Sequence, residues 1–152
     1  MNTINVHIEF GNSTYKIGEL FASADLGRHV FSYDPAFISS GLQISPFHIP
    51  LSNKTFIAQK NSAFYDLHGV FADSLPDAWG RRVQDAEFVK IGIIEPTALQ
   101  RLAFIGQCGI GALRYQPAQE FSKGDDVVRL SELRKATQKI LEGDVEEISN
   151  QL

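Results

Sequence analysis

Three glycines lie within six positions of the stretch GQCGIGAL, residues 106–113. Closely spaced glycines let a backbone approach a phosphate, so the chemistry they suggest is nucleotide binding. A phosphate loop follows a strand and opens a helix, whose N-terminal dipole favours the anion. Here a helical pattern precedes the glycines, a short strand pattern follows them, and no Lys-Ser or Lys-Thr pair comes after. This order favours a structural turn over a nucleotide site.

The residues that could hold a metal or act as a nucleophile are scattered. The histidines, at positions 7, 29, 48 and 68, lack the short spacings of zinc sites, and Cys108 has no cysteine partner. His7 and His29 fall on strand patterns, which favours ordinary surface or hydrogen-bonded roles. A catalytic Cys108 would need a nearby base and an electropositive setting, so a structural thiol is the better interpretation. The sequence predicts no metal site and no cofactor for this chain.

Charged and aromatic side chains that could take part in binding or catalysis are concentrated between Asp73 and Val83. This stretch holds two aspartates, a proline, the only tryptophan (Trp79) and the adjacent arginines Arg81 and Arg82. In one interpretation Trp79 is a core anchor and the arginines are a solvated pair, as the burial habits of these residue types suggest. In the other, these three residues form a docking surface, because Trp and Arg are enriched where interfaces are tightest.

Catalysis by Asp73 or Asp77 together with an arginine is disfavoured, because no nucleophile, base and orienting group cluster in the sequence.

Two helical patterns surround these groups. The first starts at Pro76-Asp77, with proline in the first turn, and repeats an apolar stripe of Leu75, Trp79, Val83, Ala86 and Val89. A helix usually turns such a stripe inward, so we expect Trp79 to be mainly buried. The second runs over residues 96–105, carries Leu99, Leu102 and Ala103 on one side, and stops at Gly106, which suits a left-handed cap.

The first third of the chain has the pattern of a sheet. Apolar residues alternate with polar ones from Ile4 to Phe10, and the alternation resumes after a turn at residues 11–12. A third strand is expected over residues 29–33 and a short one over residues 111–117, whereas residues 41–50 contain two prolines and suit an edge or a loop. The sequence predicts an α+β fold with a small, mostly antiparallel, partly curled sheet and two packed helices.

The chain changes character after residue 117. Residues 118–126 are polar, which predicts a linker. The residues after it predict an amphipathic helix with Ser131 as candidate cap. A helix this short needs the preceding domain, a partner or further chain to dock on. We therefore expect a domain at 1–117, a linker at 118–126 and a helical appendage at 127–152. Because the chain ends within an apolar helical pattern, we expect a truncated protein.

The bulk composition narrows the class of protein. The chain has 152 residues, 43% of them hydrophobic, which is enough for one ordinary domain with a core. The net charge of -4 argues against nucleic-acid binding, which requires clustered Lys and Arg to contact the phosphates. The N-terminus alternates polar and apolar residues, unlike a signal peptide, and no apolar run is long enough to span a membrane. We expect a cytoplasmic protein that binds neither nucleic acid nor membrane directly.

Two stretches, HGVFADSLPDAWGRR (68–82) and LAFIGQCGIGALRYQP (102–117), resemble the N-terminal region of HipA-like serine/threonine kinases. These kinases are the toxins of bacterial HipAB toxin-antitoxin modules. A family motif similar to F-x-x-x-L-P-D-x-W is matched by Phe71, Leu75, Pro76, Asp77 and Trp79. A second, similar to I-G-x-D-x-x-G-A-L, is matched by Ile105, Gly106, Gly109 or Gly111, Ala112 and Leu113, with Cys108 where an aspartate is common. The similarity covers residues 2–117, and residues 130–152 resemble the helical lead-in to the kinase core.

The resemblance implies an accessory domain that is not catalytic by itself. In the family, the ATP-binding segment and the catalytic and magnesium-binding residues lie further along the chain, so ATP and magnesium are implied only for an absent kinase core. The implied partners are that core, in cis or in trans, and a HipB-like antitoxin, with Trp79, Arg81 and Arg82 as the candidate interface. An alternative is a stand-alone small subunit of a split system that acts as antitoxin by docking on the kinase.

Overall fold

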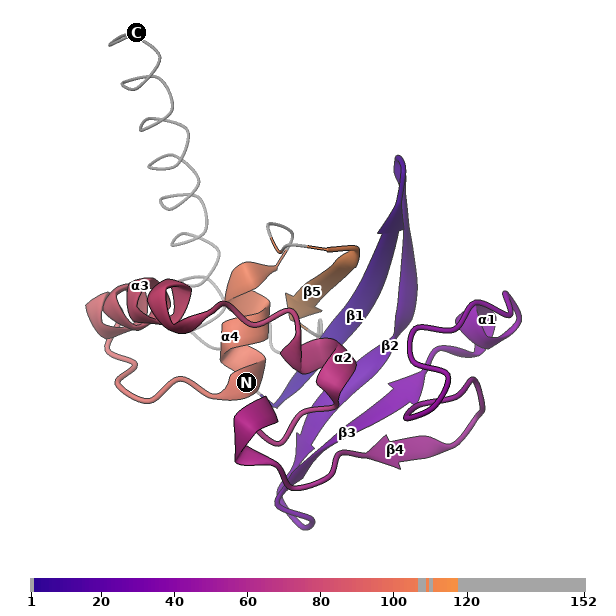
Figure 1. Cartoon of the computed structure of the whole chain (residues 1–152), viewed down its shortest axis with the longest axis horizontal. Helices are drawn as coiled ribbons and strands as arrows, with labels where there is room; N and C mark the ends of the chain where they lie inside the picture. Colours follow the sequence, from indigo (N-terminus) through magenta and orange to yellow (C-terminus); the bar gives the residue numbers. More distant parts are fainter. Residues whose placement is uncertain (1, 107–108, 110, 118–152) are drawn as a thin grey trace, which may run out of the picture.

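A five-stranded antiparallel sheet organises the domain (Figure 1). The computed structural model describes residues 2–106, 109 and 111–117. The strands are β1 (Thr3–Phe10), β2 (Ser13–Ser23), β3 (Arg28–Tyr33), β4 (Thr55–Ile57) and β5 (Leu113–Pro117). Their order across the open sheet is β4-β3-β2-β1-β5, and every neighbouring pair is antiparallel. The expected α+β class and mostly antiparallel sheet are confirmed.

Alternation of apolar residues produces the long strands, as the sequence predicts. Ile4, Val6 and Ile8 of β1 are buried, while the residues between them face the other side of the sheet. Gly11 provides the positive φ of 57° that the tight turn into β2 requires. Gly18 is needed for a different reason, because a Cβ there would lie only 2.1 Å from the Ser32 carbonyl oxygen of β3.

Within the described residues, five helical segments accompany the sheet. They are α1 (Pro35–Ile38), the 3-10 turn η1 (Ser62–Phe64), α2 (Gly69–Ala72), α3 (Ala78–Lys90) and α4 (Ala98–Ile105). The predicted helix, its buried Leu99, Leu102 and Ala103 and its end before Gly106 are confirmed, although α4 starts two residues later than expected and Gly106, with a ψ of -108°, is not in the left-handed helical conformation. Thr97 and Gln100 form a reciprocal capping box at its start, and Gly106 follows its end with a φ of 53°. Residues 41–50 form a loop, one of the two outcomes that their prolines allow.

The core lies between one face of the sheet and helices α2 and α4. It contains Ile4, Leu20, Phe31, Phe71, Leu99, Leu102 and Tyr115, all of which are buried. Its buried hydroxyls have partners: Tyr33 donates to the Ile49 carbonyl oxygen at 2.6 Å, and the Tyr115 and Ser74 hydroxyls lie 2.6 Å apart. Helix α3 contributes no residue to this core, and it lies away from the sheet in Figure 1.

The predicted linker at 118–126 and the predicted helix at 127–152 lie outside the described residues, as does Cys108. The expected domain division therefore stays a prediction.

Candidate docking surface on α3

The start of α3 is fixed by three residues of the SLPDAWG stretch. Asp77 is the N-cap, and its carboxylate accepts a hydrogen bond from the Gly80 backbone N–H at 2.9 Å. Pro76 packs directly on Gly80, where a Cβ would come within 2.7 Å of the proline Cβ. This packing fixes the rotation of the first helical turn and with it the direction in which Trp79 points.

Trp79 points into solvent and is 72% exposed. Around it lies a surface that we name the outer face of α3, formed by Trp79, Arg82, Val83, Ala86, Val89 and Lys90, all of them exposed. Residues three, four and seven positions apart are neighbours on a helix, so Trp79, Arg82, Val83 and Ala86 form one continuous patch. The patch is mainly apolar, with the exposed Arg82 beside Trp79, and Lys90 near the end of the helix forms an ion pair with Glu87 at 2.6 Å.

The opposite face of α3 is largely polar and points toward α4. The Asp85 carboxylate forms an ion pair with the Arg101 guanidinium at 2.6 Å, and the buried Gln84 side chain donates to the Arg101 carbonyl oxygen at 3.4 Å. One aromatic pair supports these contacts: the rings of Phe88 and Phe104 are 5.2 Å apart, and Phe88 is fully buried. An ordinary surface helix has the reverse arrangement, with its apolar stripe inward.

The expected burial of Trp79 is therefore wrong. Phe88 follows Trp79 by nine residues, and at about 100° per residue this offset places the two rings on opposite sides of the helix, so only one can face the domain. Phe88 takes the inward position because Phe104 of α4 lies there. The predicted stripe omitted Phe88, and considering Phe88 together with the cap at Asp77 would have signalled the conflict.

The two arginines of the predicted interface separate. Arg81 turns back toward the domain, where its guanidinium donates to the Pro76 carbonyl oxygen at 3.3 Å and lies 5.7 Å from the centre of the Tyr65 ring. Arg82 is exposed on the outer face beside Trp79. Of the three candidate interface residues, the structure therefore brings Trp79 and Arg82 together and gives Arg81 a contact within the domain.

The glycine-rich stretch lies between a helix and a strand, as predicted. Helix α4 ends at Ile105 and β5 begins at Leu113, so Gly106 follows the negative end of a helix dipole. Cys108 within this stretch is outside the described residues. The expectation that the loop holds no nucleotide stays a prediction.

Among the histidines, the strand positions of His7 and His29 are confirmed, and His29 Nδ1 lies 2.9 Å from the Asp66 carbonyl oxygen. His68 is buried beside Phe71, with ring centroids 5.8 Å apart. Burial, helped by His29 and His48, lowers the pKa of His68 to about 4. In the part of the chain that the structure describes, no three His, Cys, Asp or Glu side chains form a group that could hold a metal ion.

None of the helices within residues 2–106 and 111–117 is both long and apolar enough to cross a membrane.

The fold and this surface together define a small α+β domain that presents an apolar helix face to solvent. The chain belongs to the family of HipA N-terminal domains, whose family model matches residues 12–116. The match spans the outer face of α3 and most of the sheet. No curated protein and no solved structure gave a significant match to the chain.

Proposed function

We propose that this chain is the accessory domain of a HipA-like serine/threonine protein kinase toxin and that it docks on the kinase core through the outer face of α3. The proposal rests on the orientation of α3: Trp79 faces solvent, whereas the polar side chains of the helix face the domain. Membership of the HipA N-terminal domain family supports the identity of the partner. The domain is not catalytic by itself, and ATP and magnesium belong to the kinase core.

The energetics favour a docked Trp79. Aromatic side chains bury about 150 to 250 Å² each, and covering apolar surface gives about 25 cal/mol per Å². A partner that covers the exposed part of Trp79 would therefore gain about 3 kcal/mol from this side chain alone. Tryptophan and arginine are also the residues most enriched in interface hot spots, and here Trp79 and Arg82 are neighbours.

The charge of the outer face of α3 indicates what kind of surface the partner presents. Arg82 is exposed on the outer face, whereas Lys90 forms an ion pair with Glu87 at 2.6 Å. Arg82 is therefore the cation of this face that a partner can engage. The complementary surface is therefore an apolar pocket for Trp79 with acidic side chains at its rim. The same face serves whether the kinase core follows on the same chain or is a separate subunit. In either arrangement the protein acts in the cytoplasm, and a HipB-like antitoxin binds the assembled kinase.

Calorimetry with the HipA-like kinase core of the same system, prepared without its own N-terminal domain, tests the proposal. Trp79→Ala should weaken binding by at least about 2 kcal/mol, roughly thirtyfold. Phe47→Ala is the matched control, because it removes another exposed aromatic ring from a part of the surface outside both α3 and the cavity beside β2. Equal losses in the two variants, or none in Trp79→Ala, would contradict the proposal.

The non-catalytic part of the proposal has its own test. Titration of the isolated domain with ATP and magnesium should give no binding heat, because a helix end precedes the glycine-rich stretch. A 1:1 signal at micromolar affinity that is lost in Gly109→Asp would instead place a phosphate site in this stretch.

A further inference from the structure

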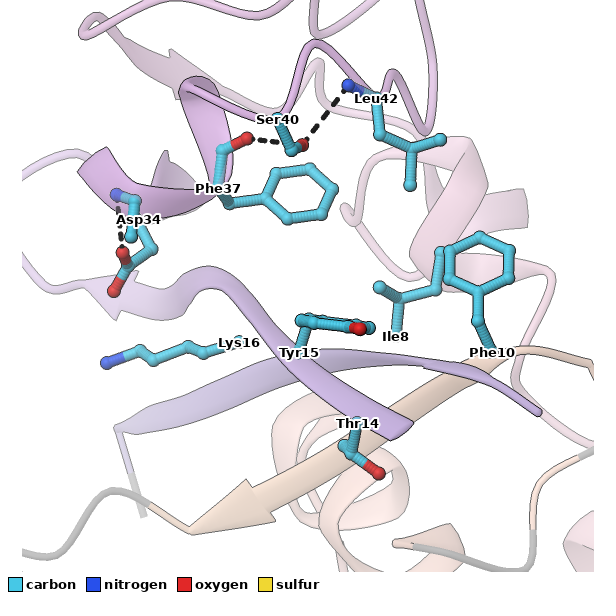
Figure 2. Close-up of a pocket in the computed structure, with 10 residues that line it drawn as sticks. Ile8, Phe10, Thr14, Tyr15, Lys16, Asp34, Phe37, Ser40 and Leu42 are labelled. Atoms are coloured by element: carbon cyan, nitrogen blue, oxygen red, sulfur yellow. Dashed lines mark hydrogen bonds between the residues drawn. The ribbon is translucent and has the colours of Figure 1, made fainter. Parts of the chain in front are cut away.

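Helix α1 lies on the opposite side of the domain from α3, as Figure 1 shows. A cavity of about 560 Å³ opens between the β1–β2 hairpin and the segment that runs from Asp34 through α1 to Leu42. This volume lies within the range of protein ligand sites. The apolar side chains of Ile8, Phe10, Tyr15, Phe37 and Leu42 line it, as Figure 2 shows.

Two of these side chains are exposed to an unusual degree for aromatic residues on a strand. Phe10 is 50% exposed and Tyr15 is 54% exposed, whereas Ile8 and Phe37 beside them are buried. The cavity therefore has a buried apolar base and two aromatic rings that remain partly uncovered. Exposed apolar surface of this kind marks interaction sites more often than ordinary surface does.

One side of the cavity is the edge of a β-strand. Strand β2 extends from Ser13, but β3 pairs with it only from Gly18 to Ser23. The Asp34 backbone N–H donates to the Ile17 carbonyl oxygen at 2.7 Å, which ends the pairing on this side. Within the described residues, nothing pairs with the outward backbone of β2 before Ile17.

The ladder shows which backbone groups point into this gap. The Glu9 N–H donates to the Ala112 carbonyl oxygen at 2.9 Å, so Glu9 directs its backbone toward β5 and not toward β2. Its partner across the hairpin, Thr14, is then in a non-hydrogen-bonded pair and directs its own N–H and C=O away from β1. The same alternation applies to Lys16, which is opposite His7.

The lining of the cavity agrees with this assignment. Thr14 lines the cavity, although in Figure 2 its side chain points away from the rings of Tyr15 and Phe37. The part of Thr14 that faces the cavity is therefore its backbone. An open strand edge of this kind is a template for another strand.

We propose that this cavity is a β-addition site that takes an extended segment of a partner protein with apolar residues at alternate positions. The backbone of the segment would pair with Thr14 and Lys16, and every second side chain would enter the cavity between Phe10, Tyr15 and Phe37. A strand presents its side chains with the same period of two, so both sets of contacts are satisfied by one chain.

The walls of the cavity favour a single peptide chain over a second copy of this domain. The open edge of β2 is short, because it ends where the Asp34 N–H donates to the Ile17 carbonyl oxygen, and Asp34, Ala36, Ser40 and Leu42 line the other side of the cavity. A short edge bordered in this way suits one extended segment. The charged groups at the rim are already engaged. Lys16 forms an ion pair with Glu19 at 2.8 Å, and the Asp34 carboxylate caps α1 through the Ala36 N–H at 2.9 Å. Recognition therefore relies on backbone pairing and apolar side chains, and a segment with uncharged polar residues between its apolar ones fits best.

The test uses two fluorescein-labelled seven-residue peptides, blocked at both ends, that contain the same valines, isoleucines and threonines. In one, apolar residues alternate with threonine, and in the other they form a continuous block. Fluorescence anisotropy should show binding of the alternating peptide to the whole chain, with at least tenfold weaker binding of the block peptide. In hydrogen exchange, the Thr14 and Lys16 amides should become protected when the alternating peptide is added.

Four variants separate backbone pairing from side-chain contact and from docking through α3. Thr14→Pro removes the outward N–H without breaking a ladder hydrogen bond, so the fold should survive and peptide binding should fall at least tenfold. Thr14→Val keeps the N–H and should bind as the wild type does. Tyr15→Ala should also weaken binding, whereas Trp79→Ala should not, which keeps this proposal distinct from docking through α3.

Several results would overturn the proposal. They are the absence of binding by the alternating peptide, equal affinity for the block peptide, unchanged binding in a folded Thr14→Pro variant, or unprotected amides at Thr14 and Lys16. A concentration-dependent dimer in sedimentation that Thr14→Pro dissociates would identify a second copy as the occupant and would equally refute a partner peptide.

Discussion

Helices α3 and α4 contact each other, yet they use their apolar residues in opposite ways. Helix α4 buries Leu99, Leu102 and Ala103 against the sheet. Helix α3 directs Trp79 and Val83 into solvent and joins α4 mainly through Asp85 and Gln84. The apolar face of α4 stabilises the domain. The apolar face of α3 adds no residue to the core, and the proposed function assigns it to docking.

The largest difference between the two helices should appear in matched truncations. Leu102→Ala empties a fully buried position and should lower the free energy of unfolding by about 2 to 5 kcal/mol. Val83→Ala removes apolar atoms from the exposed face of α3 and should change it by less than about 0.5 kcal/mol. Urea unfolding of both variants measures the difference. Comparable losses in the two would show that the outer face of α3 is part of the folded core.

A smaller effect should appear in how the free energy of unfolding depends on pH, because a buried histidine lies beside α2 and none lies on α3. The pKa of His68, beside α2, is lowered from 6.5 to about 4, so its protonation favours the unfolded chain. Stability should be complete above about pH 6.5 and should decrease as the pH falls toward 4, by on the order of 2 kcal/mol at pH 5.

Urea unfolding at pH 7 and pH 5 measures this dependence. In His68→Leu the difference between the two pH values should shrink, because the titrating group is removed. A variant with the same pH dependence as the wild type would assign the acid sensitivity to other groups. Helix α3 contains no histidine, so the effect belongs to the sheet side of the domain.

The next effect concerns the start of α3. Asp77→Ala removes the cap on the Gly80 N–H and should cost about 1 kcal/mol of stability. Because the cap also fixes the direction of Trp79, the variant should weaken docking on the kinase core as well. Asp77→Asn is the control, since asparagine caps about as well as aspartate. If Asp77→Ala binds the core like the wild type, the cap does not position the docking face.

Much of the fold could be predicted from the sequence because its signals are local. Alternation identified β1, β2 and β3, the stretch before Pro117 identified β5, and the glycine after Ile105 identified the end of α4. Strand β4 was not predicted, because three residues with two exposed side chains leave no alternating pattern. The cavity beside β2 could not be predicted either, since it depends on how the hairpin lies relative to the segment around Phe37.

The candidate site was predicted only in part, for a reason that lies in helix geometry. The residues Trp79, Arg81 and Arg82 were identified by their types, but which of them face outward depends on which side of α3 meets α4. Phe88 and Trp79 compete for that side, and the sequence alone gives no means to choose between two large aromatic rings. Arg81 and Arg82, adjacent in sequence, consequently point in different directions.

Because Trp79 is the only tryptophan, one spectrum can test the docking face most directly. The domain, labelled with 5-fluorotryptophan, should give a single fluorine resonance in NMR. In the isolated domain this resonance should shift between H₂O and D₂O, as an exposed indole requires. After addition of the unlabelled kinase core it should move and lose that solvent sensitivity. A resonance already insensitive to solvent in the free domain, or unchanged by the core, would contradict the docking role of α3.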